Sequence, residues 1–320
     1  MTTSTQPLAA DFSQRHIAQF CVLLADVMDT FLASHPEPTL TPEILPDSDL
    51  ARDWNTIGYL VADREAEEPH PDDRHTVFFG VLAKSKQVNG PYAVILRGTM
   101  GWREWADNCK IAKTQFPHPG TCTPGALVCF PDANCGSVEE GFFDIYQSMR
   151  YMPISGGPSV LAWQGIHEAI HDADAQLYVV GHSMGAALAT YLTFDLAQHA
   201  PRQAVGVFIA SPKPGNSDFA QAFDVAVADY AVYEYVRDIV PDLPPSLLGY
   251  KTLPRLIQLT VPTAQATIKD EVRSNHHALC YAAMMDYHLK TPEQWKALLV
   301  RDDCEPDCIE GPGYALQLAA

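Results

Sequence analysis

Short apolar runs alternate along this chain with segments of helical periodicity. The runs are rich in β-branched and aromatic residues and are bounded by polar residues or glycine, which is typical of strands. They span 76–82, 92–96, 177–180, 205–210 and 232–236. Helices are predicted between them, at 138–149, 159–172, 183–198 and 218–230. Strands that alternate with helices, several of them apolar throughout, predict an α/β protein whose mostly parallel sheet is covered by helices on both faces.

The chain before the first predicted strand divides into three parts. Residues 1–10 are expected to be a flexible tail. From Asp11 to Phe31, apolar residues recur at helical spacing, which predicts an amphipathic helix opened by an acidic cap. Polar and Pro-rich residues then fill 35–73, which we expect to be mostly irregular. Nothing in the composition marks a long polar linker, so we expect one domain over 1–320.

Composition and charge narrow the classes of function. With 47% hydrophobic residues, the chain can bury a large core. Its 21 basic and 39 acidic side chains give a formal charge of −18, which argues against a nucleic-acid partner. The most apolar stretch, 17–32, is interrupted by Asp26 and Asp29, so we expect no transmembrane segment. No basic residue precedes Arg15, which favours a cytoplasmic protein or one exported without an N-terminal signal peptide.

The clearest signal for chemistry is a GxSxG motif, formed by Gly181, His182, Ser183, Met184 and Gly185. The apolar run 177–180 leads directly into it, and the helix-forming segment 186–192 leaves it. A strand that turns into a helix within one residue strains the middle residue, and flanking glycines remove Cβ atoms that would clash. Ser183 is therefore predicted to stand at the carboxyl edge of the sheet. His182 is expected to point away from Ser183 and to be structural. A plain turn with Ser183 as an N-cap residue is the alternative.

Around this motif the chain resembles the class 3, or fungal-type, lipases of the α/β-hydrolase fold. Blocks typical of that family follow in its order at 93–99, 105–107, 141–146, 211–219 and 236–241. The chain differs from the family before Gly141, where Glu139 or Glu140 holds a position usually held by histidine. It also carries a long, cysteine-bearing loop after Thr99. The resemblance implies the α/β-hydrolase fold and a serine-dependent ester hydrolase, but it does not carry over a substrate preference.

A serine hydroxyl becomes a strong nucleophile only when an imidazole accepts its proton and a carboxylate orients that imidazole. In α/β-hydrolases the three residues follow in the order Ser, Asp, His. Asp238 follows the last predicted strand and lies in the block that carries the family's acid. The resemblance points to His276 as the base, because the family's base commonly precedes a tyrosine by five positions and Tyr281 occupies that place. The alternatives left open are Asp242 for the acid and His277 or His288 for the base.

The negative oxygen that forms during ester cleavage needs two hydrogen-bond donors. The backbone N–H of Met184, the residue after the nucleophile, is expected to supply one. The resemblance implies that Thr99 supplies the other.

A hydrophobic substrate needs an apolar approach to this centre. The resemblance implies a lid in the cysteine-bearing insertion 100–137. Within it, Trp102 and Trp105 lie three positions apart, so they share a helix face from which they would cover an acyl chain. Trp105 as an ordinary core residue is the alternative. Leu247 and Leu248 either line the acyl pocket or merely pack.

One motif points to a different enzyme class. Residues 167–171 spell HExxH in a predicted helix, which is the pattern of zinc metallopeptidases. The apolar stripe of that helix places both histidines toward solvent, and no recognisable block supplies a third ligand. None of the eight cysteines has CxxC spacing, so a thiolate metal site is not expected, while both disulfides and buried free thiols are compatible with the even number.

Together these features predict a serine carboxylic-ester hydrolase, a lipase or esterase that acts on acylglycerols through an acyl-enzyme on Ser183. A phospholipase A1 or an aryl (feruloyl-type) esterase on the same three residues is the alternative, and a zinc metallopeptidase through 167–171 is a further one. Hydrolysis and acyl transfer use the same residues and are not distinguished. We expect no metal or other cofactor, a lipid or small-molecule ester as substrate, and transient contact with a lipid interface.

Overall fold

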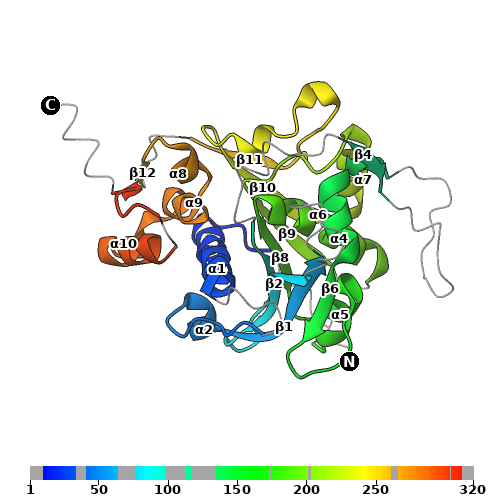
Figure 1. Cartoon of the computed structure of the whole chain (residues 1–320), viewed down its shortest axis with the longest axis horizontal. Coiled ribbons are helices and arrows are strands. Elements are labelled where there is room, and N and C mark those ends of the chain that lie inside the picture. Colours follow the sequence, from blue (N-terminus) through cyan, green and yellow to red (C-terminus); the bar gives the residue numbers. More distant parts are fainter. Residues whose placement is uncertain are drawn as a thin grey trace, which may run out of the picture.

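The core of the molecule is a nine-stranded sheet in the order β11-β10-β9-β8-β3-β2-β1-β6-β7 (Figure 1). The computed structural model describes residues 10–33, 41–63, 76–98, 112–116, 135–172, 174–200, 203–260, 266–302 and 304–311. The strands of the sheet are β1 (Trp54–Asp63), β2 (Thr76–Ser85), β3 (Tyr92–Leu96), β6 (Arg150–Pro153), β7 (Val160–Leu161), β8 (Leu177–His182), β9 (Ala204–Ile209), β10 (Asp229–Tyr235) and β11 (Leu256–Leu259).

The sheet has a parallel half and an antiparallel half. Strands β3, β8, β9, β10 and β11 run parallel to one another, whereas β2 pairs antiparallel with β3, and β1, β6 and β7 continue the sheet by antiparallel pairing. Every residue of β3 and β9 is buried, as the continuous apolar runs predict for strands covered on both faces. The parallel strands bring their carboxyl ends to one edge of the sheet.

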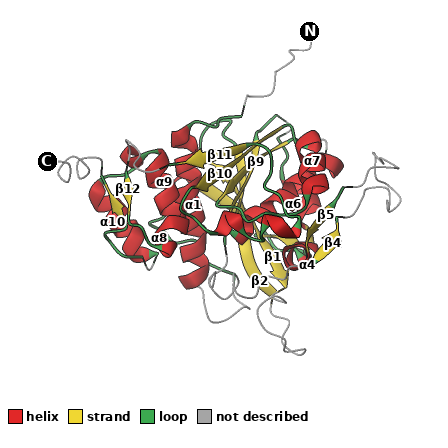
Figure 2. Ribbon diagram, turned by 90° about the horizontal axis from the view of Figure 1, so that it is seen from above, coloured by secondary structure: helices red, strands yellow, loops and turns green. Residues whose placement is uncertain are grey.

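Helices cover both faces of this sheet (Figure 2). The helices are α1 (Gln14–Ala33), α2 (Asp49–Asp53), α4 (Glu140–Ser148), α5 (Ala162–Ala169), α6 (Met184–His199), α7 (Ser217–Ala226), α8 (Val272–His276), α9 (Ala278–Met285) and α10 (Pro292–Arg301). Buried side chains of α1, α9 and α10 form one apolar core with the sheet, and those of α4, α5, α6 and α7 form a second core on the opposite face. The described residues also form the short 3₁₀ helices η2 (Val240–Asp242), η3 (Ser246–Leu248) and η4 (Tyr287–Leu289).

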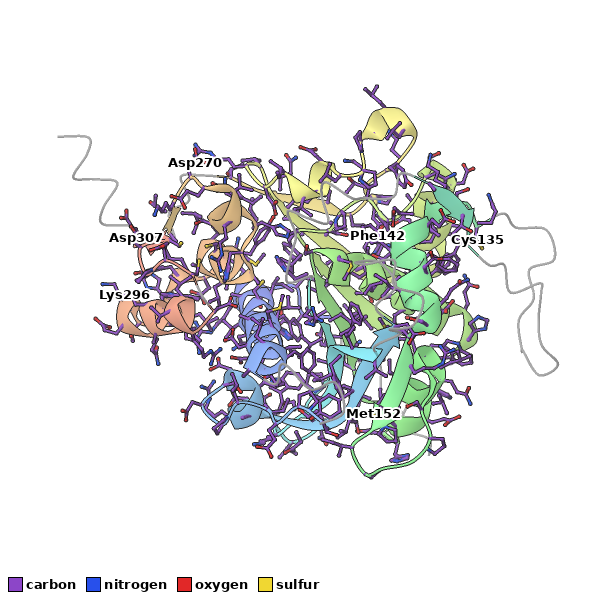
Figure 3. The ribbon with its side chains drawn as sticks, viewed as in Figure 1. Cys135, Phe142, Met152, Asp270, Lys296 and Asp307 are labelled. Atoms are coloured by element: carbon purple, nitrogen blue, oxygen red, sulfur yellow. The ribbon has the colours of Figure 1, made fainter. Side chains whose placement is uncertain are left out.

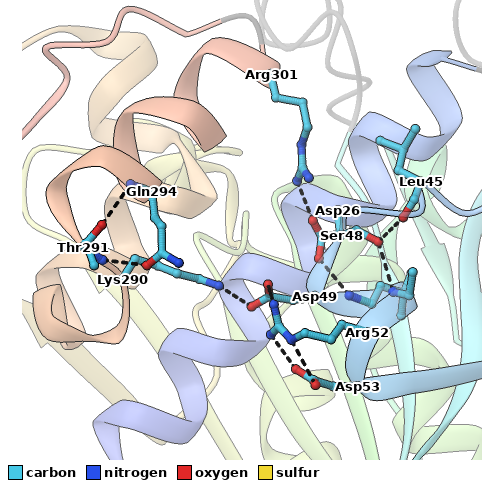
Figure 4. A network of polar contacts seen from close by, with 12 residues as sticks. Asp26, Leu45, Ser48, Asp49, Arg52, Asp53, Lys290, Thr291, Gln294 and Arg301 are labelled. Carbon is cyan, nitrogen blue, oxygen red and sulfur yellow. Dashed lines mark hydrogen bonds and ion pairs between the residues drawn. The ribbon is translucent and has the colours of Figure 1, made fainter.

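Helix α1 is more deeply buried than its amphipathic pattern predicts. By length and apolar composition alone it would suffice to cross a bilayer, but 72% of the stretch concerned is buried inside the structure. Its two aspartates, Asp26 and Asp29, are themselves buried and form ion pairs with Arg301 at the end of α10. Figure 4 shows the contact between Asp26 and Arg301. Both carboxylates therefore have a cationic partner, as burial of a charge requires.

Three sequence predictions of elements are wrong in part. The stretch 35–73, expected to be irregular, contains α2 and the ten-residue strand β1. The helix expected at 218–230 ends at Ala226, because β10 begins at Asp229 and pairs there with Val205 of β9. The helix expected at 159–172 begins at Ala162 and ends at Ala169.

Part of the expected insertion 100–137 has regular structure. Strand β4 (Lys113–Gln115) pairs antiparallel with β5 (Ser137–Glu139), beside the main sheet. Cys135, just before β5, is a buried free thiol. Residues 99–111 and 117–134 lie outside the described residues, as do 1–9 of the expected tail.

Candidate active site

Ser183 occupies a sharp turn between β8 and α6. Its backbone dihedral angles are φ 57° and ψ −133°, a conformation that non-glycine residues rarely adopt. The turn is possible because Gly185 has no side chain. A Cβ on Gly185 would lie 2.2 Å from the carbonyl oxygen of Arg97, which directly follows β3. The backbone N–H of Ser183 donates to the carbonyl of Ile209 at 3.0 Å, which fixes the turn to the end of β9. This is the strained strand-to-helix turn that the GxSxG motif predicts.

The hydroxyl of Ser183 is enclosed. The residue is 2% exposed, and its Oγ has no hydrogen-bond partner among the described residues. Gly98 lies directly against it, since a Cβ on Gly98 would be 2.9 Å from the Cβ of Ser183. A buried hydroxyl without a partner is uncommon, and such groups deserve a chemical explanation.

Asp238 and His276 meet at the carboxyl end of β10. The Oδ2 of Asp238 lies 2.8 Å from the Nδ1 of His276, and both residues are more than nine-tenths buried. Asp238 Oδ2 also accepts a hydrogen bond from the Tyr281 hydroxyl at 2.9 Å, and its Oδ1 accepts from the backbone N–H of Val240 at 3.0 Å. Because a carboxylate only accepts, Nδ1 of His276 carries a proton, and in the neutral imidazole Nε2 is left with the lone pair.

His182 connects this pair to the serine turn. Its Nε2 lies 2.7 Å from the carbonyl oxygen of His276, so Nε2 donates, and the two imidazole rings lie 4.7 Å apart. Burial, together with the neighbouring His276, lowers the pKa of His182 well below its usual value, so this ring stays neutral. His182, next to the candidate nucleophile Ser183, therefore contacts the backbone of the candidate base, His276.

The sequence predicts only that the His182 side chain points away from Ser183, and it does not reveal the contact with the carbonyl of His276. Its position next to Ser183 was the only available signal. No local pattern reveals that a chain segment 94 residues later returns to meet it.

The alternative histidines have other partners. His277 Nε2 lies 2.6 Å from Asp302 Oδ2, and its Nδ1 accepts from the backbone N–H of Leu279 at 3.2 Å, so it caps α9. His288 is exposed on η4. Asp242, the alternative acid, is exposed at the end of η2. Among the candidate acids and bases, the structure thus brings together Asp238 and His276.

The candidate oxyanion donors are only partly described. Met184 is the first residue of α6 and is buried, so its backbone N–H belongs to the unpaired amino end of that helix. Thr99 lies outside the described residues, immediately after Gly98. Trp102 and Trp105 also lie outside the described residues.

The two leucines expected near an acyl pocket lie on the surface. Leu247 is 99% exposed and Leu248 is 42% exposed, both on η3, which follows the Asp238 turn and η2. They do not merely pack into the core. Lys113 of β4 donates to the carbonyl of Leu248, which ties η3 to the small β4-β5 sheet.

The geometry required for a zinc peptidase is missing from the HExxH segment. Helix α5 ends at Ala169, so His171 lies beyond it and does not share a helix face with His167. Glu168 accepts a hydrogen bond from Gln164 at 2.9 Å. Within the described ranges, no group of three or more His, Cys, Asp or Glu side chains is arranged to hold a metal ion.

Comparisons with known proteins identify similar lipases. Residues 93–248 match the family model of class 3 lipases, "Lipase (class 3)". Phospholipase A1-II 3 of Oryza sativa subsp. japonica is 29% identical over 183 residues, which are 52% of this chain and 41% of that protein. The secreted mono- and diacylglycerol lipase A of Penicillium cyclopium is 29% identical over 165 residues, 51% of this chain and 46% of that protein. The chain thus spans about half the length of the curated relatives it matches.

A solved structure extends the likeness to the fold. A variant form of MDLA from Penicillium cyclopium superposes with a TM-score of 0.52 at 20% identity, over 79% of this chain and 83% of that chain. The α/β-hydrolase fold predicted from the sequence is confirmed.

Proposed function

Because residues 93–248 match the family model of class 3 lipases, we propose that this chain is a member of that family and a serine carboxylic-ester hydrolase that acts on acylglycerols. One observation carries the proposal: the Asp238–His276 pair lies beside the strained turn that holds Ser183, whose hydroxyl has no partner among the described residues. The three residues follow in the order that α/β-hydrolases use. In this proposal the described and undescribed parts of 1–320 form one catalytic domain.

The reaction uses each group in turn. His276 Nε2 accepts the proton of the Ser183 hydroxyl as its oxygen attacks the ester carbonyl, and Asp238 stabilises the imidazolium that results. The backbone N–H of Met184 and the N–H of Thr99 donate to the negative oxygen of the tetrahedral intermediate. His276 then returns the proton to the departing alcohol, which leaves an acyl group on Ser183. Water, activated by the same imidazole, releases the fatty acid.

The substrate class rests on the relatives and on the exposed leucines. A mono- and diacylglycerol lipase is among the relatives, which supports an acylglycerol. Leu247 and Leu248 present apolar side chains to solvent beside the Asp238 turn, where they would touch a lipid surface or an acyl chain. Trp102 and Trp105 complete this apolar approach in the proposal, as a cover over the acyl chain.

A phospholipase A1 is the second candidate function. Rice proteins named phospholipase A1 are among the relatives, at the same 29% identity as the fungal lipase. Both activities cleave a carboxylic ester with the same residues, so they differ only in the group that the site tolerates beyond the glycerol. Release of fatty acid from diacylglycerol and from phosphatidylcholine, measured side by side with and without an emulsified interface, tests which class is preferred.

The nucleophile is tested directly by Ser183→Ala. Removing the attacking oxygen is expected to lower kcat on p-nitrophenyl esters by about 10⁶-fold, by analogy with a serine protease. Ser211→Ala is the matched control, because Ser211 is also buried and follows the neighbouring strand β9, yet its hydroxyl donates to the carbonyl of Pro212. Ester turnover that survives in Ser183→Ala would overturn the proposal.

A further inference from the structure

Two cysteines near the end of the described chain lie in contact with each other. The Sγ atoms of Cys304 and Cys308 are 3.3 Å apart, and both residues are free thiols. A tight turn brings them together, in which the backbone N–H of Cys308 donates to the carbonyl of Glu305 at 3.1 Å. Cys304 is 7% exposed and Cys308 is 2% exposed, so the turn packs its sulfur atoms inward.

The turn is joined to the segment that leads to His276. Strand β13 (Ile309–Glu310) follows Cys308 and pairs with β12 (Thr267–Ile268), and the backbone N–H of Lys269 donates to the carbonyl of Cys308 at 3.0 Å. The Ser274 hydroxyl, in α8, lies 3.2 Å from the Sγ of Cys308. The thiol pair therefore lies directly behind the short helix that ends at His276.

We propose that Cys304 and Cys308 form a disulfide that closes this turn behind α8. The oxidant is a low-molecular-weight disulfide of the glutathione type. The thiolate of one cysteine attacks a sulfur atom of that disulfide, which forms a mixed disulfide and releases one small thiol. The second cysteine, losing its proton, attacks the mixed disulfide and expels the second small thiol. Two protein thiols are oxidised, and one small disulfide is reduced to two thiols.

The surroundings of the pair determine when this exchange takes place. Burial, together with contact with Cys308, raises the pKa of the Cys304 thiol to about 12, and both cysteines are buried, so a dissolved disulfide meets little Cys304 thiolate in the folded protein. The attack therefore occurs while the turn is still open, during folding. Once formed, the bond is buried and shielded from reducing thiols.

Closing the turn limits the freedom of the unfolded chain and keeps β13 against β12. A loop of this length is expected to raise Tm by about 3 °C in a protein of this size. On the proposed function, the same link braces the helix that carries the catalytic base. Disulfide formation itself does not depend on that function, so its test requires no activity measurement.

Peptide mapping after folding in a glutathione redox buffer tests the bond. Cleavage after Arg301 releases residues 302–320, which contain Cys304 and Cys308 and no other cysteine, whereas cleavage after Arg273 and Lys290 isolates Cys280 alone. We expect the 302–320 peptide to resist alkylation and to be two hydrogen atoms lighter than its dithiol form. Alkylation of both cysteines, or a link from either of them to Cys280, would overturn the proposal.

Thermal unfolding supplies the second measurement. We expect oxidation to raise the Tm of the wild-type protein by about 3 °C and to leave the Tm of Cys304→Ser unchanged. Cys135→Ser is the matched control, since Cys135 is also a buried free thiol but lies on the opposite side of the molecule from Asp307 in the cysteine turn (Figure 3). Cys135→Ser should show the same rise in Tm on oxidation as the wild type. An equal gain in Cys304→Ser would contradict the proposed pairing.

Discussion

Asp238 has three hydrogen-bond donors at once, from His276, Tyr281 and the backbone of Val240. These donors fix the carboxylate in the one orientation that holds the proton on His276 Nδ1. Asp238→Asn keeps the shape but replaces an acceptor with an amide that can donate, so the imidazole adopts the wrong tautomer. We expect kcat on p-nitrophenyl esters to fall by about 10⁴-fold, as for the equivalent change in a serine protease.

Asp242→Asn is the control for this substitution. Asp242 is exposed and lies four residues after Asp238 in the sequence. Its change to asparagine removes the same charge. It should retain activity within a few-fold of the wild type. Equal losses in the two variants would show that charge near the site matters and that the Asp238–His276 contact does not.

The sequence indicates candidate residues for this site, but it does not indicate all of their contacts. Ser183 was marked by a local pattern, because two glycines and a strand-to-helix switch are needed to build the turn. Asp238 and His276 followed from their order along the chain and from the family resemblance. The contact between His182 and the His276 carbonyl joins residues 94 positions apart, so only the folded chain reveals it.

At the scale of elements, prediction was accurate where strands are apolar throughout and failed where they are irregular. Strand β3 was predicted to the residue. Strand β1 was missed because its pairing with β2 shifts register between Thr56 and Gly58 and again between Leu60 and Val61. Such bulges break the alternation of polar and apolar positions by which a strand is identified. The end of α7 was misplaced because pairing of β10 with β9 outweighs the apolar pattern that would continue the helix.

Helices α1 and α10 are joined by ion pairs between Arg301 and two buried aspartates, and the removal of Arg301 should be costly. Arg301 contacts Asp26 (Figure 4) and also Asp29, both of which are buried in α1. Asp26 also accepts a hydrogen bond from the backbone N–H of Leu50 at 3.0 Å. Arg301→Met would leave both carboxyl groups without their cation. We expect the free energy of unfolding to fall by about 3 kcal/mol in a urea titration.

Arg15→Met provides the matched comparison. Arg15 forms an ion pair with Asp286 at 2.9 Å, but its side chain is 62% exposed. Exposed pairs contribute about 0–1 kcal/mol, so the loss should be much smaller. If the two variants lost the same stability, burial would not be what makes the Arg301 pair important.

Across the whole molecule, the formal charge of −18 overstates the charge of the folded chain near neutral pH. Burial raises the pKa of Asp195 to about 6 and that of Glu234 to about 7. Some of the acidic residues that made the chain look strongly anionic are therefore partly protonated in the fold, and their ionisation opposes folding.

At Glu234 the effect of ionisation on the free energy of unfolding can be measured. It lies on β10, its Oε1 is buried without a hydrogen-bond partner among the described residues, and its charged neighbours are Lys213, Asp242 and Asp238. Its pKa rises on folding from 4.5 to about 7, mainly through burial. The protonated form is thus favoured in the fold: its contribution is complete below the unfolded pKa and is lost as pH rises through the folded one.

The glutamine in Glu234→Gln cannot ionise, so the stability of this variant relative to the wild type should increase as pH rises. We expect the difference in the free energy of unfolding between variant and wild type to shift in favour of the variant by about 2–3 kcal/mol between pH ~4.5 and pH ~8.5. Urea titrations at both pH values measure it, with Glu168→Gln, an exposed position on α5, controlling for the lost charge. Comparing two pH values removes the fixed cost of burying an amide. A difference that stays constant with pH would mean that Glu234 remains ionised in the fold, with Lys213 as its effective counter-charge.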